Sequence, residues 1–275
     1  MTFSVSHWSG RLGNNIQQIA NCIMAAEKYK STFRQKLDHD IISKYDVNFE
    51  KLLASDYTGQ GRYYSWEPLV HCEKGIYEGG NETGLEVEHI YSNMHSVCKE
   101  HIAPNLKLPQ KQTIGDDTIV MHLRSGDHFE QLYDPPAFSY VPNPLIFYLN
   151  LIDSFDKCIL VTEPDKDNPI LQELEKIDKV QIQSTTVEND FATLMNAKNI
   201  ALSGVGTFAI GAALCSTHVK DVYATDAYLT EHLNYNMLDP DEHSVHIMEL
   251  PNYIPTFPCS WKNDDEQRKF ILDYR

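Results

Sequence analysis

Apolar and polar positions follow a regular order near the start of the chain. Residues 3–8 alternate, which predicts a strand, and a short segment containing Gly10 and Gly13 then turns the chain. Between residues 15 and 30, apolar side chains recur at three- and four-residue spacing, which is typical of a helix with one buried face. A strand, a glycine-containing turn and a helix in this order indicate the start of an α/β domain.

The second half of the chain repeats this order several times. Short apolar runs predict strands at 118–123, 158–162, 180–183, 199–203 and 219–224. The segments between them predict helices at 144–155, 168–177, 190–197 and 207–215, and a further helix is expected at 264–274. Because strands alternate with helices, we expect a parallel, doubly wound sheet. The pattern is weaker over 31–109, and the polar, turn-rich stretch 109–117 is the predicted linker.

Composition limits the partners of this chain. At roughly 150 residues per domain, its 275 residues suggest about two domains or one large one. Lys and Arg total 23 against 39 Asp and Glu, and the resulting net charge of −16 disfavours nucleic acid and anionic membranes as partners. We expect no membrane-spanning segment, because no apolar run reaches the ~18 residues that one needs, and no signal peptide. The six cysteines form no Cys-x-x-Cys pair, which favours a reducing, cytoplasmic location.

Three turns that follow predicted strands contain residues able to bind an anion. In the first, Gly10 and Gly13 let the backbone approach a ligand, and the next helix offers free N–H groups. Arg11 and Asn14 add side-chain donors in the same turn. An ordinary connection between a strand and a helix has the same pattern, so that alternative stays open.

The second turn places His122, Arg124 and Asp127 at the end of a buried strand, where ligands of open α/β sheets bind. Arg124 would present a planar guanidinium suited to phosphate, but a structural ion pair between Arg124 and Asp127 is the alternative. The third turn precedes a helix whose N–H groups are able to hold a diphosphate. Its contributing residues are Ser203, Gly204, Gly206, Thr207 and Phe208.

These turns carry a resemblance to a known family. The run Gly10-Arg11-Leu12-Gly13-Asn14 resembles the Gly-x-Leu-Gly-Asn segment of the α1,2-fucosyltransferases. Residues 122–127 (His-Leu-Arg-Ser-Gly-Asp) are similar to the family's His-x-Arg-Arg-Gly-Asp motif. Residues 190–195 and 203–208 are similar to its third block, an Asp-Phe-x-x-Met helix followed by a Ser-rich turn that ends in Phe. The blocks occur in the family's order, with a poor match between them.

The resemblance implies an inverting, metal-independent glycosyltransferase of the GT-B type, in which two Rossmann-like domains face each other across a cleft. It implies a mainly acceptor-binding domain at residues 1–113 and a nucleotide-sugar-binding domain at 114–250. A tail at 251–275 would pack back towards the first domain. The donor would be GDP-fucose, the acceptor a glycan hydroxyl, and no cofactor or metal would be needed.

Carried over by position, the resemblance assigns Arg124 to the β-phosphate of the donor, and His122 and Asp190 to the surroundings of the base and ribose. The other donor-binding residues would be Gly10, Arg11, Gly13, Asn14, Ser203, Gly204, Gly206, Thr207 and Phe208. Glu163 follows a predicted strand, and it either contacts the base or ribose or is an exposed loop carboxylate.

Inversion also needs a base for the acceptor hydroxyl. Asp127 is the first candidate, Glu130 the second and Asp134 the third, although each would equally fit surface charge. Aromatic residues in the less regular region are candidates for stacking on the acceptor sugar, with core packing as the alternative. They are Tyr63, Tyr64 and Trp66.

Three departures from the family pattern leave alternatives open. Ser125 stands where the family has a second Arg, Asn15 stands where it has Gln, and Ala209-Ile210 stand where a Trp pair often follows the third block. A UDP-sugar such as UDP-xylose therefore remains open as the donor, and a non-catalytic nucleotide- or sugar-binding protein remains open as the function. The Asp-x-Asp triplets at 38–40, 165–167 and 239–241 are interpreted as solvated loops, not as metal ligands.

Overall fold

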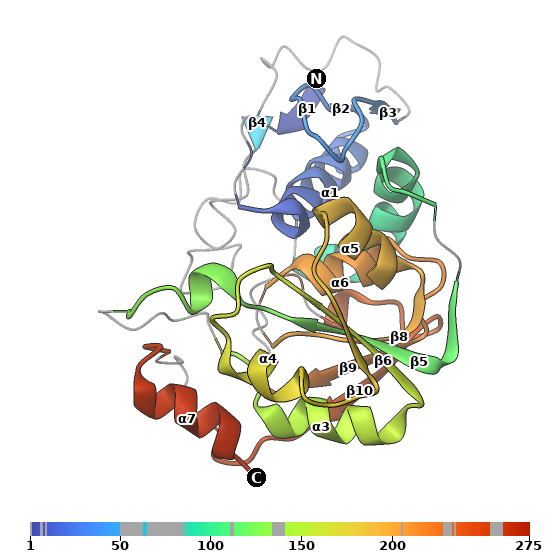
Figure 1. Ribbon diagram of the computed structural model, residues 1–275. Helices are drawn as coiled ribbons and strands as arrows, with labels where there is room; N and C mark the ends of the chain where they lie inside the picture. The colour runs from blue at the N-terminus through green and yellow to red at the C-terminus, as the bar shows by residue number, and fades with distance from the viewer. Residues whose placement is uncertain are drawn as a thin grey trace.

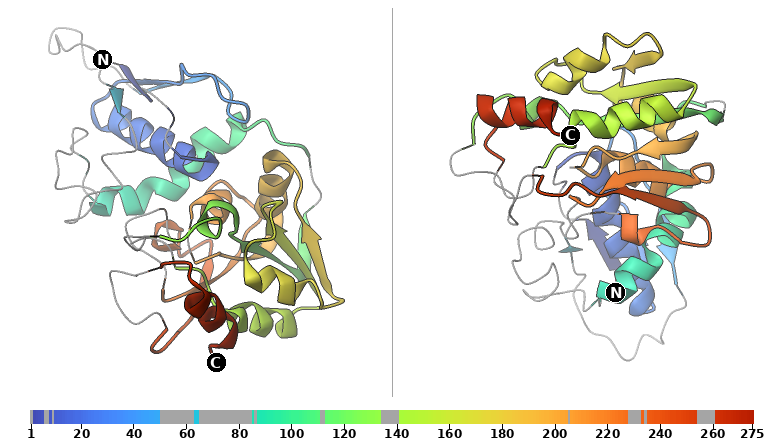
Figure 2. Two further views of the ribbon diagram at one scale, coloured as in Figure 1. Left: turned by 60° about the vertical axis from the view of Figure 1, so that its left-hand side comes forward. Right: turned by 90° about the horizontal axis from the view of Figure 1, so that it is seen from below.

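The computed structural model describes residues 2–5, 8, 10–49, 63–64, 85, 87–110, 113–133, 141–204, 206–227, 233, 235–253 and 261–275. Two sheets and the helices around them make up this part of the chain (Figure 1). The two ends of the chain lie at opposite ends of the molecule (Figure 2).

Six parallel strands form the larger sheet, in the order β10-β9-β8-β5-β6-β7. Their bounds are β5 (Ile114–Leu123), β6 (Lys157–Thr162), β7 (Val180–Gln183), β8 (Ala197–Ala201), β9 (Asp221–Thr225) and β10 (Ser244–Met248). The chain thus moves outward from β5 to β7 and then returns to the other side of β5 with β8. Doubly wound sheets of this order bind ligands where the direction changes, beyond the carboxyl ends of the strands. Here that position lies between β5 and β8.

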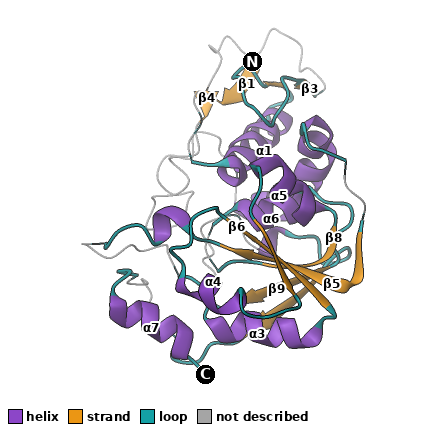
Figure 3. Ribbon diagram, in the orientation of Figure 1, coloured by secondary structure: helices purple, strands orange, loops and turns teal. Residues whose placement is uncertain are grey.

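Helices cover both faces of the larger sheet (Figure 3). One layer contains α3 (Leu145–Ser154), α4 (Pro169–Leu174) and α7 (Asp265–Asp273). The other contains α5 (Val187–Met195) and α6 (Phe208–Leu214), followed by α1 (Leu12–Lys28) and α2 (Val87–Val97). Successive side chains of β5 pack alternately into the two layers: Met121 and Leu123 pack in the first, and Val120 packs in the second. This is the alternation that a strand buried on both faces requires.

The first half of the chain forms a smaller sheet in the order β3-β2-β1-β4. Its strands are β1 (Thr2–Val5), β2 (Thr32–Arg34), β3 (Asp46–Asn48) and β4 (Tyr63–Tyr64). Helix α1 packs against β1 on one side and against α6 on the other, so a continuous apolar core joins the two halves. Figure 1 shows α5 and α6 between α1 and the larger sheet.

The predicted parallel, doubly wound α/β sheet is confirmed, and each strand and helix predicted in the second half is present with its ends shifted by a few residues. Among the described residues, no helix has both the length and the apolar character that crossing a membrane requires.

The predicted helix at the C-terminus is α7, which packs against α3 and α4. The described part of the tail therefore packs locally, whereas we expected it to return to the first domain. Buried Trp261 and Ile271 hold it there.

Three other expectations need correction. The predicted linker 109–117 is partly strand, because β5 begins at Ile114. Two exposed carboxylates of this segment form ion pairs with lysines of the neighbouring strands: Asp116 with Lys198, and Asp117 with Lys157. The first half contains α2, β2 and β3, which the weaker pattern did not reveal, and β10 was missed because this edge strand keeps few apolar side chains.

Candidate functional site

A pocket of about 640 Å³ lies at the change of direction between β5 and β8, and both halves of the chain line it. The first half contributes Gly10, Arg11, Leu12, Gly13, Asn14, His39, Asp40 and Ile41. The second half contributes His122, Arg124, Asp127, His128, Val161, Thr162, Glu163, Pro164, Thr185, Val187, Glu188, Asp190, Gly206, Thr207 and Phe208. Its volume is within the range of small-molecule sites, roughly 300–1,000 Å³.

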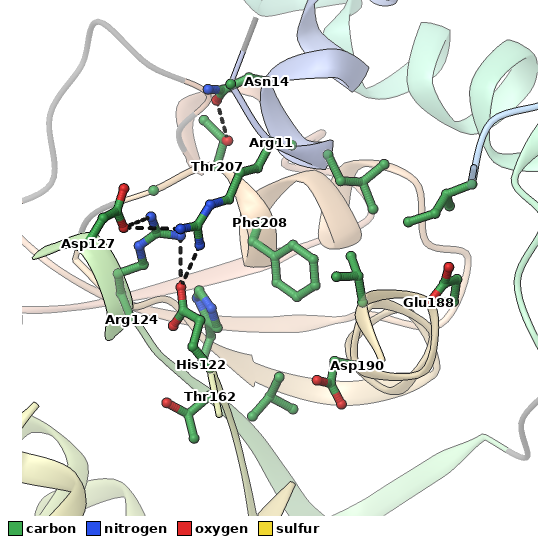
Figure 4. Close-up of a pocket in the computed structure, with 18 of the residues that line it drawn as sticks. Arg11, Asn14, His122, Arg124, Asp127, Thr162, Glu188, Asp190, Thr207 and Phe208 are labelled. Carbon is green, nitrogen blue, oxygen red and sulfur yellow. Dashed lines mark hydrogen bonds and ion pairs between the residues drawn. The ribbon is translucent and has the colours of Figure 1, made fainter. Parts of the chain in front are cut away.

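Two guanidinium groups, one from each half, meet at one end of this pocket (Figure 4). Arg11 donates to Glu163 Oε1 at 3.0 Å and to Asp127 Oδ1 at 3.3 Å. Arg124 pairs with the same two oxygens, at 2.9 Å for Glu163. The ion pair between Arg124 and Asp127, which the sequence analysis gave as the alternative to phosphate binding by Arg124, is present. Among the described residues, however, the buried Nε of Arg124 has no hydrogen-bond partner, so this guanidinium retains an unused donor.

The loop after β5 fixes the position of Arg124. Its backbone oxygen accepts a hydrogen bond from Asn168 Nδ2 at 2.8 Å. Ser125 is fully buried, and its backbone N–H donates to Glu163 Oε2 at 2.7 Å while its hydroxyl donates to Asp165. A larger arginine would not fit at position 125 without opening this loop. Ser125 therefore acts in positioning, by tying the strand ends of β5 and β6 together.

The beginnings of α1 and α6 cross within van der Waals distance beside the two guanidiniums. A Cβ added to Gly13 would lie 2.3 Å from the backbone oxygen of Thr207, which makes glycine necessary there. Thr207 Oγ1 also donates to Asn14 Oδ1 at 2.6 Å. The N-terminus of α1, which carries partial positive charge, consequently faces the same end of the pocket as Arg11 and Arg124.

An aromatic ring lies in the middle of the pocket, and carboxylates lie at its other end. The ring of Phe208 lies 5.4 Å from that of His122 and is central among the labelled side chains of Figure 4. Asp190 accepts hydrogen bonds from Gln183 Nε2 at 2.8 Å and from both the N–H and the hydroxyl of Thr185. Five carboxylates line the pocket against two arginines, and these are Asp40, Asp127, Glu163, Glu188 and Asp190. Only the arginine end is therefore suited to an anion.

Burial controls the charge of the groups in the pocket. Burial and the nearby Arg124 lower the pKa of His122 and that of His128 from 6.5 to about 3, so both imidazoles are neutral near pH 7. Burial alone would raise the pKa of Asp127, but Arg124, His128 and Arg11 outweigh it and hold this pKa below its ordinary value. Asp127 is therefore an anion, and a weak proton acceptor while both arginines contact it.

We expect the protein to lose stability as the pH falls from 6.5 towards 3. The unfolded chain regains ordinary histidine pKa values, so in this range it binds more protons than the folded chain, and the free energy of unfolding decreases. The loss for His122 is on the order of 2 kcal/mol by about pH 5. Urea denaturation at about pH 7.5 and about pH 5 measures it. His122→Gln should reduce the difference in unfolding free energy between the two pH values, and His246→Gln, a control at an exposed site, should leave that difference unchanged. Equal pH dependence in all three proteins would contradict an origin in His122.

Most residues proposed from the sequence converge on the pocket, but several do not. Glu130 is exposed and outside the pocket lining, and Ser203 instead shares a 3.1 Å hydrogen bond with His122 Nδ1. Gly204 approaches Asn143 so closely that a Cβ would lie 2.4 Å from its Oδ1, which indicates a packing role. The side chains of Tyr63 and Tyr64, and all of Trp66 and Asp134, lie outside the described residues.

Sequence reasoning missed some lining residues, notably His39, Thr162 and Glu188. Thr162 ends β6 and its buried hydroxyl has no partner in the part of the chain that the structure describes, a signal that only coordinates reveal. His39 Nδ1 accepts from the N–H groups of Ile41 and Ile42, so its role is to shape the loop that borders the pocket.

Comparison with known proteins adds no identification. No protein-family model matches the chain, and no curated protein matches its sequence. The functional argument therefore depends on the pocket itself: two guanidiniums, the first turn of a helix, an aromatic ring and a set of carboxylates at the ligand-binding edge of a doubly wound sheet.

Proposed function

We propose that this protein is an inverting glycosyltransferase that moves a sugar from a nucleotide diphosphate donor to a glycan hydroxyl, without a metal ion at the transfer site. The observation that carries the proposal is the meeting of Arg11 and Arg124, from different halves of the chain, at the switch point of the sheet. GDP-fucose is the donor that the family resemblance favours, and a UDP-sugar such as UDP-xylose is the alternative.

The distribution of charge supports one orientation of the donor. The diphosphate fits the arginine end, where it would accept from the guanidinium groups of Arg11 and Arg124 and from N–H groups of the first turn of α1. The nucleoside fits beside Phe208, where the carboxylates of Glu188 and Asp190 are able to accept from ribose hydroxyls. A bare anion would be repelled from that second end, whereas a hydroxylated ring would not.

Transfer builds negative charge on the leaving diphosphate. Positioned guanidiniums stabilise that charge as it develops, which lowers the barrier without a divalent cation. When the diphosphate binds, it accepts hydrogen bonds from guanidinium N–H groups that otherwise donate to Asp127 and Glu163. Asp127 then loses part of what holds its pKa down, and it becomes a better acceptor for the proton of the acceptor hydroxyl. Asp127 lines the pocket and Glu130 does not, so Asp127 is the better candidate base.

In this proposal the enzyme has the GT-B arrangement. Residues 1–113 mainly bind the acceptor, and residues 114–250 mainly bind the donor. Arg11, Gly13 and Asn14 reach the donor from the first of these units.

A non-catalytic protein that binds a nucleotide or a sugar at the same site is the second candidate. The observation that favours it is that both arginines pair with the carboxylate of Asp127, because a paired carboxylate is a poor catalytic base.

Nucleotide binding is the first expected result. GDP or UDP at about 100 times its dissociation constant should stabilise the fold by roughly 2.7 kcal/mol, which raises the melting temperature by several degrees. Thermal denaturation and calorimetry with GDP, UDP, GDP-fucose and UDP-sugars measure this, and EDTA should leave the nucleotide affinity unchanged. Binding without transfer or hydrolysis across a broad acceptor panel would favour the non-catalytic candidate. Absence of binding by every nucleotide would reject the glycosyltransferase, and of the second candidate it would leave only a protein that binds a sugar.

A further inference from the structure

A second group of ligating side chains lies outside the pocket. His95 is in the last turns of α2, and Asp239 and Glu242 are in the turn that precedes β10. Each of the three offers one ligand atom, and these atoms lie within 4.8 Å of one another. We propose that His95, Asp239 and Glu242 bind a divalent transition-metal ion, for which Zn²⁺ is the probe.

His95 supplies the observation that points to a ligand. Its side chain is only 4% exposed, and its buried Nε2 has no hydrogen-bond partner among the described residues. Leaving such an atom unsatisfied destabilises the fold, and a bound ion is one way to satisfy it.

One of the two carboxylates, Glu242, already faces a cation. Both oxygens of Glu242 accept from Lys99 Nζ, at 2.7 and 2.6 Å, and both side chains are partly exposed. A divalent ion would replace the ammonium as the counter-charge, and the flexible lysine would turn to solvent. Asp239 is held in place, since its Oδ1 accepts from the N–H of Asp241 and its backbone oxygen accepts from His243 Nδ1.

The donor set selects the class of metal. One imidazole nitrogen and two carboxylate oxygens suit Zn²⁺ and similar ions, whereas Mg²⁺ and Ca²⁺ prefer sites built from oxygen alone. None of the three residues lines the pocket, so the ion would be structural and separate from sugar transfer. It would attach α2, from the first half, to the connection that leads into the edge strand β10 of the larger sheet.

Zn²⁺ titration of the full chain, first treated with EDTA, tests the proposal. We expect one Zn²⁺ per chain by calorimetry, a raised melting temperature, and a Co²⁺ absorption band typical of bound metal. Glu242→Gln and Asp239→Asn should each weaken Zn²⁺ binding by at least about 10- to 100-fold, because changes in supporting residues alone have effects of that size. Asp241→Asn is the matched control in the same turn and should bind like the original protein.

Lys99→Met is an independent test, because we expect it to raise the Zn²⁺ affinity that the carboxylate variants lower. Removing the competing ammonium should tighten Zn²⁺ binding by about tenfold, the effect of roughly 1.4 kcal/mol. His95→Asn should abolish the Co²⁺ band, and if this buried substitution unfolds the chain, the two carboxylate variants still decide the matter. No stoichiometric Zn²⁺ binding, or binding that Glu242→Gln and Asp239→Asn leave unchanged, would overturn the proposal.

Discussion

Arg124→Ala should lower the rate of sugar transfer by about 10²- to 10³-fold, the usual effect of removing one positioned donor from a developing negative charge. Arg124 has the deeper position of the two guanidiniums, with a side chain 13% exposed against 56% for Arg11. Its electrostatic effect on a diphosphate is therefore less screened by water. Turnover with the nucleotide-sugar donor identified by the binding screen measures the loss.

Two further variants separate this role from a general effect on folding. Arg124→Lys keeps the charge but loses the planar array of donors, so its rate should fall between those of the original protein and Arg124→Ala. Arg34→Ala removes an arginine that pairs with Asp46 at 2.9 Å outside the pocket lining, and it should retain full activity. The fold of Arg124→Ala should persist, because Arg11 still pairs with Asp127 and Glu163. Near-normal transfer by a folded Arg124→Ala protein would remove Arg124 from the mechanism.

The sequence predicted most of the larger sheet because its strands are buried on both faces. Such strands appear as continuous apolar runs, as at residues 118–123, and they are separated by segments with helical spacing. β10 gives no such signal, since this edge strand exposes Ser244, His246 and Ile247. Nor does a local pattern reveal that Asp116 and Asp117 extend β5, because lysines from neighbouring strands supply their partners.

The site was predictable at its glycine turns and not between them. Strand ends followed by glycine and helix identified the positions of Arg11, Arg124 and Thr207, which do converge. Their chemical state was not predictable, because it depends on contacts between distant segments. Glu163 accepts from arginines of both halves, and this pairing makes the arginine end nearly neutral before any ligand arrives. The triplet 239–241 shows the same limit: Asp239 resembles a solvated loop residue until the fold brings His95 beside it.

Gly13→Ala should destabilise the fold by about 1–3 kcal/mol, the common cost of adding a methyl group to a tightly packed contact. The added Cβ would lie 2.3 Å from the backbone oxygen and 2.5 Å from the Oγ1 of Thr207. Backbone cannot rotate away as a flexible side chain does, so the first turns of α1 and α6 must separate. That separation breaks the hydrogen bond between Thr207 and Asn14 and moves Arg11 relative to Arg124. Nucleotide affinity should therefore fall together with stability.

Urea denaturation and nucleotide calorimetry on two alanine variants measure both effects. Gly115→Ala is the matched control, because a Cβ there meets nothing closer than 3.9 Å, and its stability should stay within about 0.5 kcal/mol of the original protein. If Gly13→Ala were as stable as Gly115→Ala, the crossing of α1 and α6 would not be the tight contact described above. If it lost stability but bound nucleotide with full affinity, the beginning of α1 would pack the two halves together without helping to hold the diphosphate. The proposed donor site needs both losses, since it assigns the diphosphate to the place where the two halves meet.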